Sequence, residues 1–158
     1  MKALTDSGIK AMAPMLSPLW RRADSEKYGF SSTWSERHAA YVAGLGTFGL
    51  SDGLITSKGK AHRVGSAIAN VVIAPRTRPY RGHHAYCLFF AKGTCGACVQ
   101  KYPAGAITEK GHDKKKCSAY LDETRAYVAA HYGFKGQGCG LCQVGVPCES
   151  SIPEGIDI

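Results

Sequence analysis

All seven cysteines of this 158-residue chain lie between Cys87 and Cys148, so the first half of the chain contributes none. The sequence has no apolar run long enough to cross a bilayer and no secretory signal pattern, so we expect a cytoplasmic protein with no membrane association, whose thiols are kept reduced. Seven is an odd number, and complete disulfide pairing would leave one cysteine over. The distribution therefore favours metal binding and concentrates the chemistry in the C-terminal half.

The first cysteine motif is C-L-F-F-A-K-G-T-C-G-A-C-V-Q-K-Y-P, which contains Cys87, Cys95 and Cys98 ahead of Pro103. Bacterial ferredoxins hold iron-sulfur clusters with the run C-x2-C-x2-C-x3-C-P, in which the fourth cysteine binds the other cluster. Aligned on the proline, the three cysteines take the first three positions, with a longer first spacer. The fourth position holds Tyr102 instead of a cysteine.

A second set of cysteines follows the first motif. Cys117 stands alone in a segment that we expect to be helical, and C-G-L-C-Q-V-G-V-P-C carries the last three cysteines. Aligned on its proline, this run has Val146 at the final cysteine position, and Cys148 comes two residues later. Because cluster ligands interleave in ferredoxins, the pattern assigns two ligand sets. One consists of Cys87, Cys95, Cys98 and Cys148, and the other of Cys117, Cys139 and Cys142.

Zinc is the alternative metal for this pattern, since C-x2-C pairs also occur in zinc knuckles. The pairs Cys95 with Cys98 and Cys139 with Cys142 would together make one four-cysteine site. That arrangement leaves the other three cysteines unexplained, so we favour iron-sulfur clusters.

Local signals predict a mixed α+β fold. Ser35 is a suitable N-cap for a short helix, and a longer helix is predicted over about 115–131, with an aspartate before it and a glycine after it. We expect a β-hairpin in the first half of the chain. Its first strand is predicted at 54–56, its turn at 57–60, and its second strand in the β-branched segment 64–74.

The formal charge of +8 invites an interpretation as a nucleic-acid-binding protein. Two clusters with cysteine thiolates would each carry about two negative charges and so would remove roughly half of that excess. Scattered basic residues more often form a solvated face, so we weigh nucleic acid as a less favoured partner. The basic band flanking the predicted hairpin consists of Lys58, Lys60, His62, Arg63, Arg76, Arg78 and Arg81.

Two further motifs invite a functional interpretation. Residues 44–49 match G-x-G-x-x-G, but a dinucleotide site requires the glycines to follow a strand and open a helix, whereas here they follow a helix. His83 and His84 lie near Cys87 and His112 precedes Cys117, so these histidines are candidates for contact with the clusters. Adjacent histidines on a polar loop are more often solvated, and we expect no ligand role for His83 and His84.

The sequence resembles epoxyqueuosine reductases and the related reductive dehalogenases. The matching residues are W-S-E-R-H-A-A-Y-V-A-G-L-G-T-F-G-L-S-D-G-L-I-T at 34–56, G-T-C-G-A-C-V-Q-K-Y-P-A-G-A-I, the stretch G-H-D-K-K-K-C-S-A-Y-L and C-G-L-C-Q-V-G-V-P-C. The resemblance implies a bacterial ferredoxin-like module with two [4Fe-4S] clusters at 79–158. It also implies that residues 1–78 are the end of a nitroreductase-like domain that holds a cobalamin in that family.

The residues before Trp34 are too few to build the usual cobalamin pocket, so we expect a C-terminal fragment or a naturally shortened member of the family. In the family, cysteines stand at the positions of Tyr102 and Val146. With three thiolates, the second site could hold a [3Fe-4S] cluster, a [4Fe-4S] cluster with another ligand on one iron, or no stable cluster.

Three functions follow from these patterns. The first is electron transfer through iron-sulfur clusters, with a redox partner protein or the absent cofactor domain as the partner. The second is a fragment of a cobalamin-dependent reductase that acts on tRNA or a small molecule, and the third is a zinc-stabilised basic module that binds nucleic acid. We favour electron transfer, in which the cysteines are cluster ligands, the fold supplies insulation and no protein side chain makes a bond.

Overall fold

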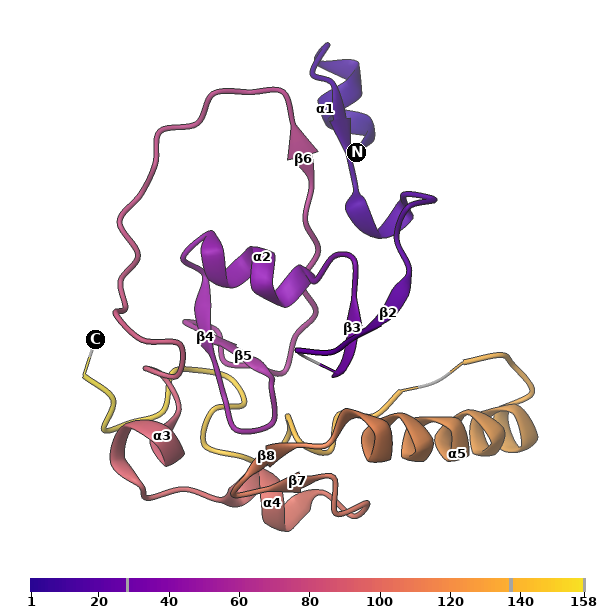
Figure 1. Cartoon of the computed structure of the whole chain (residues 1–158), viewed down its shortest axis with the longest axis vertical. Helices are drawn as coiled ribbons and strands as arrows, with labels where there is room; N and C mark the ends of the chain where they lie inside the picture. The colour runs from indigo at the N-terminus through magenta and orange to yellow at the C-terminus, as the bar shows by residue number, and fades with distance from the viewer. Residues whose placement is uncertain (28, 137, 158) are drawn as a thin grey trace. The chain divides into compact units, whose positions relative to one another are not determined.

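The computed structural model describes residues 1–27, 29–136 and 138–157 (Figure 1). The chain forms two compact units, and both are discontinuous in sequence. The first unit comprises Met1–Leu45 and Arg63–Pro79, and the second comprises Gly46–His62 and Tyr80–Ile158. The sequence-based division into a cofactor-domain segment and an iron-sulfur domain at residue 78 stays a prediction.

The first unit contains short helices and two small antiparallel sheets. One sheet pairs β1 with β6, and the other pairs β2 with β3. Helix α2 begins after Ser35, whose hydroxyl accepts a hydrogen bond from the backbone N–H of His38, so the predicted N-cap is confirmed. The elements of this unit are α1 (Lys2–Asp6), β1 (Ala11–Met12), the 3-10 helix η1 (Pro14–Leu16), β2 (Arg22–Ser25), β3 (Gly29–Ser32), α2 (Glu36–Val42) and β6 (Ile68–Ala69).

The second unit combines two hairpins with three helices. The β4–β5 hairpin is antiparallel, and so is the small β7–β8 pair that leads into the long helix α5 (Figure 1). The elements are β4 (Gly46–Phe48), β5 (Leu54–Thr56), α3 (Leu88–Lys92), α4 (Ala97–Lys101), β7 (Ile107–Thr108), β8 (Gly111–His112) and α5 (Lys114–Tyr132). The mixture of helices and small sheets agrees with the predicted α+β class.

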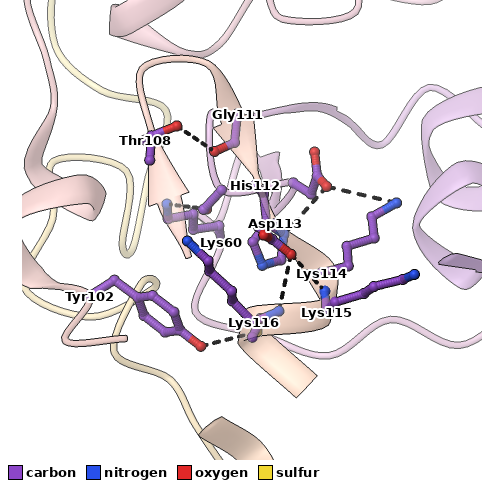
Figure 2. Close-up of polar contacts among 12 residues, drawn as sticks. Lys60, Tyr102, Thr108, Gly111, His112, Asp113, Lys114, Lys115 and Lys116 are labelled. Atoms are coloured by element: carbon purple, nitrogen blue, oxygen red, sulfur yellow. Dashed lines mark hydrogen bonds and ion pairs between the residues drawn. The ribbon is translucent and has the colours of Figure 1, made fainter. Parts of the chain in front are cut away.

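Helix α5 confirms the predicted long helix. The carboxylate of Asp113 accepts hydrogen bonds from the backbone N–H groups of Lys115 and Lys116, both at 3.0 Å (Figure 2). These contacts satisfy two of the free donors at the first turn, and the helix ends at Gly133. None of the helices in the described part of the chain combines the length and the apolar character needed to cross a bilayer.

The predicted hairpin partner of residues 54–56 is wrong. Strand β5 pairs with β4, which precedes it, while the segment 64–74 contains only β6, and β6 pairs with β1 in the other unit's sheet. A side chain at Gly46 would collide with the backbone of Ile55, so this glycine permits the close pairing. The β-branched residues of 64–74 gave a strong strand signal, but the short β4 carried none.

The apolar core lies in the second unit. Ile55 and Ile107 are completely buried, together with Thr47, whose hydroxyl accepts a hydrogen bond from the backbone N–H of Tyr86. Further buried apolar residues of this unit are Leu50, Leu54, Tyr80, Tyr86, Cys87, Cys98, Tyr102, Ala106 and Val146. Two of the seven cysteines thus belong to the core itself.

Candidate metal centre

Four cysteines line one pocket of the second unit. They are Cys87, Cys95, Cys98 and Cys148, which we call the first cysteine group. The rest of the lining is largely apolar and comes from Gly49, Leu50, Lys60, Leu88, Phe89, Ala97, Val146, Pro147 and Pro153. These four cysteines are the set that the ferredoxin pattern assigns to one cluster, although their role as ligands stays a prediction.

Two short helices and a loop position three thiols of this group. Cys87 is the N-cap residue of α3, and Cys98 lies in the first turn of α4, which begins after Gly96. Cys148 lies in the C-terminal loop, where its carbonyl oxygen accepts a hydrogen bond from the backbone N–H of Lys60 at 2.9 Å. This last contact fixes the loop against the turn that follows β5.

Burial and charge act in opposite directions on these thiols. Burial raises the pKa of Cys98, the positive charge of Lys60 lowers it, and the neighbouring thiols raise it further. The pKa of Cys148 is also raised by burial, and Lys60 opposes that shift through its charge and through a hydrogen bond to the thiol. Lys60 is therefore the group that most favours thiolates here.

The remaining three cysteines form the second cysteine group, Cys117, Cys139 and Cys142, beside Tyr102. The Tyr102 hydroxyl donates a hydrogen bond to Cys117 Sγ at 3.0 Å. Burial raises the pKa of Tyr102 far above its usual value, and the hydrogen bond to Cys117 and the charges of all three thiols add to the shift. In this arrangement the phenol keeps its proton and acts as a donor toward sulfur.

Cys142 connects the second group to a buried serine. Burial raises the pKa of the Cys142 thiol, whereas the charge of Lys60 and a hydrogen bond from Ser51 lower it; Cys139 and Cys117 raise it. The two C-x2-C pairs therefore belong to different groups: Cys95 and Cys98 to the first, and Cys139 and Cys142 to the second.

The donor chemistry fits iron-sulfur clusters. Each group offers three or four thiols, and the first lies in an apolar pocket that would shield a cluster from water. Among residues 1–27, 29–136 and 138–157, no three His, Cys, Asp or Glu side chains converge closely enough to hold a metal ion.

The histidines considered in the sequence make other contacts. His84 is half-buried, its Nδ1 donates to the carbonyl oxygen of Phe48 at 2.8 Å, and its ring stacks on Phe90. His83 is exposed, and its carbonyl oxygen accepts from the backbone N–H of Phe48. Nδ1 of His112 lies 3.4 Å from a carboxylate oxygen of Asp52. For His84 and His112, the ring nitrogens in these contacts face groups other than thiols.

Lys60 is the functional candidate that the sequence did not single out. The sequence places Lys60 in the basic band, but its side chain is 2% exposed and faces thiols, so it is not available to phosphates. Its neighbour Lys58 in the same turn is exposed. The only sequence signal was the glycine at position 59, which indicated a turn but not the direction of the next side chain.

Comparison with known proteins finds similarity to epoxyqueuosine reductases. The chain is 31% identical over 119 residues to the epoxyqueuosine reductases of Bacillus anthracis and Bacillus cereus, which covers 72% of this chain and 29% of each relative. It is 37% identical over 60 residues to an uncharacterized protein in the gldA 3′ region of Geobacillus stearothermophilus, which covers 35% of this chain and 28% of that protein.

No family model and no solved structure matches the chain. The chain spans less than a third of the length of the curated relatives named above. Within that span, the similarity supports a relationship between this chain and the epoxyqueuosine reductases.

Proposed function

We propose that this chain binds two iron-sulfur clusters and transfers electrons, as the ferredoxin-like module of an oxidoreductase related to epoxyqueuosine reductases. The observation that carries the proposal is the interleaving of the two cysteine groups. Cys148 joins the three cysteines of the first motif, while Cys117 joins the C-x2-C pair at 139–142. Interleaving of this kind is typical of two-cluster ferredoxins, in which one motif supplies ligands to both clusters.

A bound cluster would supply a site for one electron, and the protein would supply ligation and insulation. The first cysteine group would hold one cluster through four thiolates, and Leu50, Leu88 and Phe89 would exclude water from it. The second group would hold the other through three thiolates, with the Tyr102 hydroxyl donating toward Cys117. We propose a redox protein or a cofactor-bearing domain as the electron-transfer partner.

The zinc alternative receives less support from the geometry. It requires the two C-x2-C pairs to share one site, but Cys95 and Cys98 line a pocket with Cys87 and Cys148. The other pair interacts with Cys117 and Tyr102. Two separate groups of thiols suit two clusters better than one zinc ion.

Iron and acid-labile sulfide in anaerobically purified protein test the proposal. We expect a brown protein with broad absorbance near 400 nm and about seven or eight iron atoms per chain. Cys98→Ser and Cys142→Ser should each lose about half of the iron, since they lie in different groups. Thr94, the exposed neighbour of Cys95, provides the control: Thr94→Ala should keep all of the iron. A colourless protein with stoichiometric zinc would refute the proposal.

Tyr102 offers a sharper test of the second site, because it stands where the ferredoxin pattern has a cysteine. With three thiolates, the second group should give a [3Fe-4S]-type signal in low-temperature EPR, and Tyr102→Cys should remove that signal by supplying a fourth thiolate. Two ordinary four-iron clusters in the unmodified protein would contradict this expectation.

The similarity to epoxyqueuosine reductases favours a second candidate function, namely a part of a cobalamin-dependent reductase. Hydroxocobalamin added to the full chain should then change its absorption spectrum on binding. An unchanged spectrum over a saturating titration would leave electron transfer as the function of this chain.

A further inference from the structure

The side-chain ammonium group of Lys60 is buried between the two cysteine groups. A lysine is rarely buried to this degree unless its charge is compensated. Within the described ranges, no carboxylate forms an ion pair with Lys60. Its polar contacts are instead a serine hydroxyl and a thiol. The groups near Lys60 that could carry a compensating negative charge are therefore thiolates or the clusters that they would hold.

Lys60 and Ser51 connect one cysteine of each group. Lys60 Nζ donates to Ser51 Oγ at 3.1 Å and also donates to the thiol of Cys148. Ser51 is buried as well, and its hydroxyl lowers the pKa of the Cys142 thiol. Lys60 and Ser51 are thus bonded to each other, and each favours the thiolate of one cysteine, Cys148 in the first group and Cys142 in the second.

The backbone holds this arrangement in place. Lys60 follows a turn in which Gly59 has a φ of +73°, and the backbone N–H of Lys60 donates to the carbonyl oxygens of Cys148 and Glu149 at 2.9 and 3.0 Å. Ala61 adds another such bond to Glu149 at 3.0 Å. Ser51 lies in the loop that joins β4 to β5, so one hairpin and the turn after it deliver both polar side chains.

The charge of Lys60 acts on both groups. It lowers the pKa of Cys98 and Cys148 in the first group and of Cys142 in the second. A charge that favours thiolates also favours the extra negative charge that a cluster gains on reduction. Inside a protein this attraction is stronger than in water, because the effective dielectric constant is lower.

We propose that Lys60 and Ser51 form a polar bridge that raises the reduction potentials of both iron-sulfur sites and couples them electrostatically. The inference rests on the proposed function. Reduction of either cluster adds one electron and no bond forms or breaks, so the fixed ammonium charge stabilises the reduced form. Lys60 is a positioning residue that acts through the cluster ligands.

The test is a potentiometric EPR titration of the full chain, purified anaerobically with its clusters, with dithionite as the electron source. Lys60→Met keeps the length of the side chain but removes its charge. We expect both midpoint potentials to fall. At a fixed solution potential, the ratio of reduced to oxidised cluster should drop about tenfold, which corresponds to about 59 mV for a one-electron couple.

Two other variants make the result specific. Ser51→Ala should lower the potential of the second group's cluster more than that of the first, because Ser51 contacts Cys142. Lys58→Met removes an exposed charge from the same turn and should leave both potentials unchanged. The signals are assigned with Cys98→Ser and Cys142→Ser.

The outcomes separate this inference from the function on which it rests. Protein that lacks iron and sulfide refutes both. Clusters whose potentials are the same in Lys60→Met and in the unmodified protein refute the bridge alone, as does an equal shift in Lys58→Met. Should Lys60→Met fail to retain clusters, Ser51→Ala decides: a selective shift of the second cluster supports the bridge, and no shift overturns it.

Discussion

The two units of the chain bury their residues to very different extents. In the first unit, the buried residues of the described part are Pro14 and Ala40, while large apolar side chains such as Val72 and Ile73 are exposed. The second unit buries a core around Ile55 and Ile107 and carries all seven cysteines. Apolar composition alone therefore does not make a core, because only the second unit packs its apolar side chains around one another.

The largest effect should come from emptying part of the second unit's core. We expect Ile55→Ala to lower the free energy of unfolding by about 2–5 kcal/mol, because the side chain is fully buried and its removal leaves a cavity. Ile68 of β6 offers the matched control: its side chain is 47% exposed, so Ile68→Ala should change stability by about 0.5 kcal/mol or less. Urea unfolding followed by circular dichroism measures both, and equal losses would contradict the contrast.

An intermediate effect is expected at the turn that precedes Lys60. Gly59 has a positive φ, and an added Cβ would meet the backbone of Glu149, so Gly59→Ala should destabilise the protein by more than about 1 kcal/mol. Gly65, in the first unit, has open space and no such constraint. Gly65→Ala should be neutral or slightly stabilising, by up to about 1 kcal/mol. The same urea titration measures the free energy of unfolding of both variants. An unchanged value for Gly59→Ala would mean that the backbone of this turn can shift to accept a side chain.

The smallest effect concerns pH and the start of α5. Hydrogen bonds from the backbone of Lys116 and Lys115 lower the pKa of Asp113 below its usual value of 3.8. A depressed pKa stabilises the folded state above the unfolded value and loses that contribution as pH falls through the folded value. Helical circular dichroism should therefore decrease modestly below about pH 4.

Two variants of Asp113 check the origin of that decrease. Asp113→Asn keeps a capping side chain but cannot titrate, so this component of the pH dependence should disappear while the helix remains. Asp113→Ala should weaken the helix at every pH. An acid decrease of the same size in Asp113→Asn would assign the titration to other carboxyl groups.

Features encoded over short distances could be predicted from the sequence. Ser35 and Asp113 were identifiable as caps because a capping side chain reaches backbone groups only two or three residues away. The ferredoxin spacing also predicts which thiols interleave, and the four thiols of the first cysteine group line one pocket. The ligation of iron by either cysteine group remains a prediction.

Features that depend on contacts distant in sequence could not be predicted. The pairing of β5 with β4 depends on the fit of Gly46 against Ile55, whereas the stronger β-branched signal at 64–74 pointed to the wrong partner. The burial of Lys60 depends on hydrogen bonds to residues almost ninety positions later, at Cys148 and Glu149. A lysine beside other basic residues carries no local sign that its charge will be enclosed.

Residues 46–62 belong to the second unit, although a stretch of the first unit separates them from the rest of it in sequence. A polypeptide cut to residues 79–158 would retain every thiol but would lose Ile55 from its interior and the cation that faces the sulfur atoms. Such a fragment should fail to form a packed core, even with iron and sulfide supplied. The shortest self-sufficient piece has to begin upstream of the β4–β5 hairpin, well before the first cysteine appears.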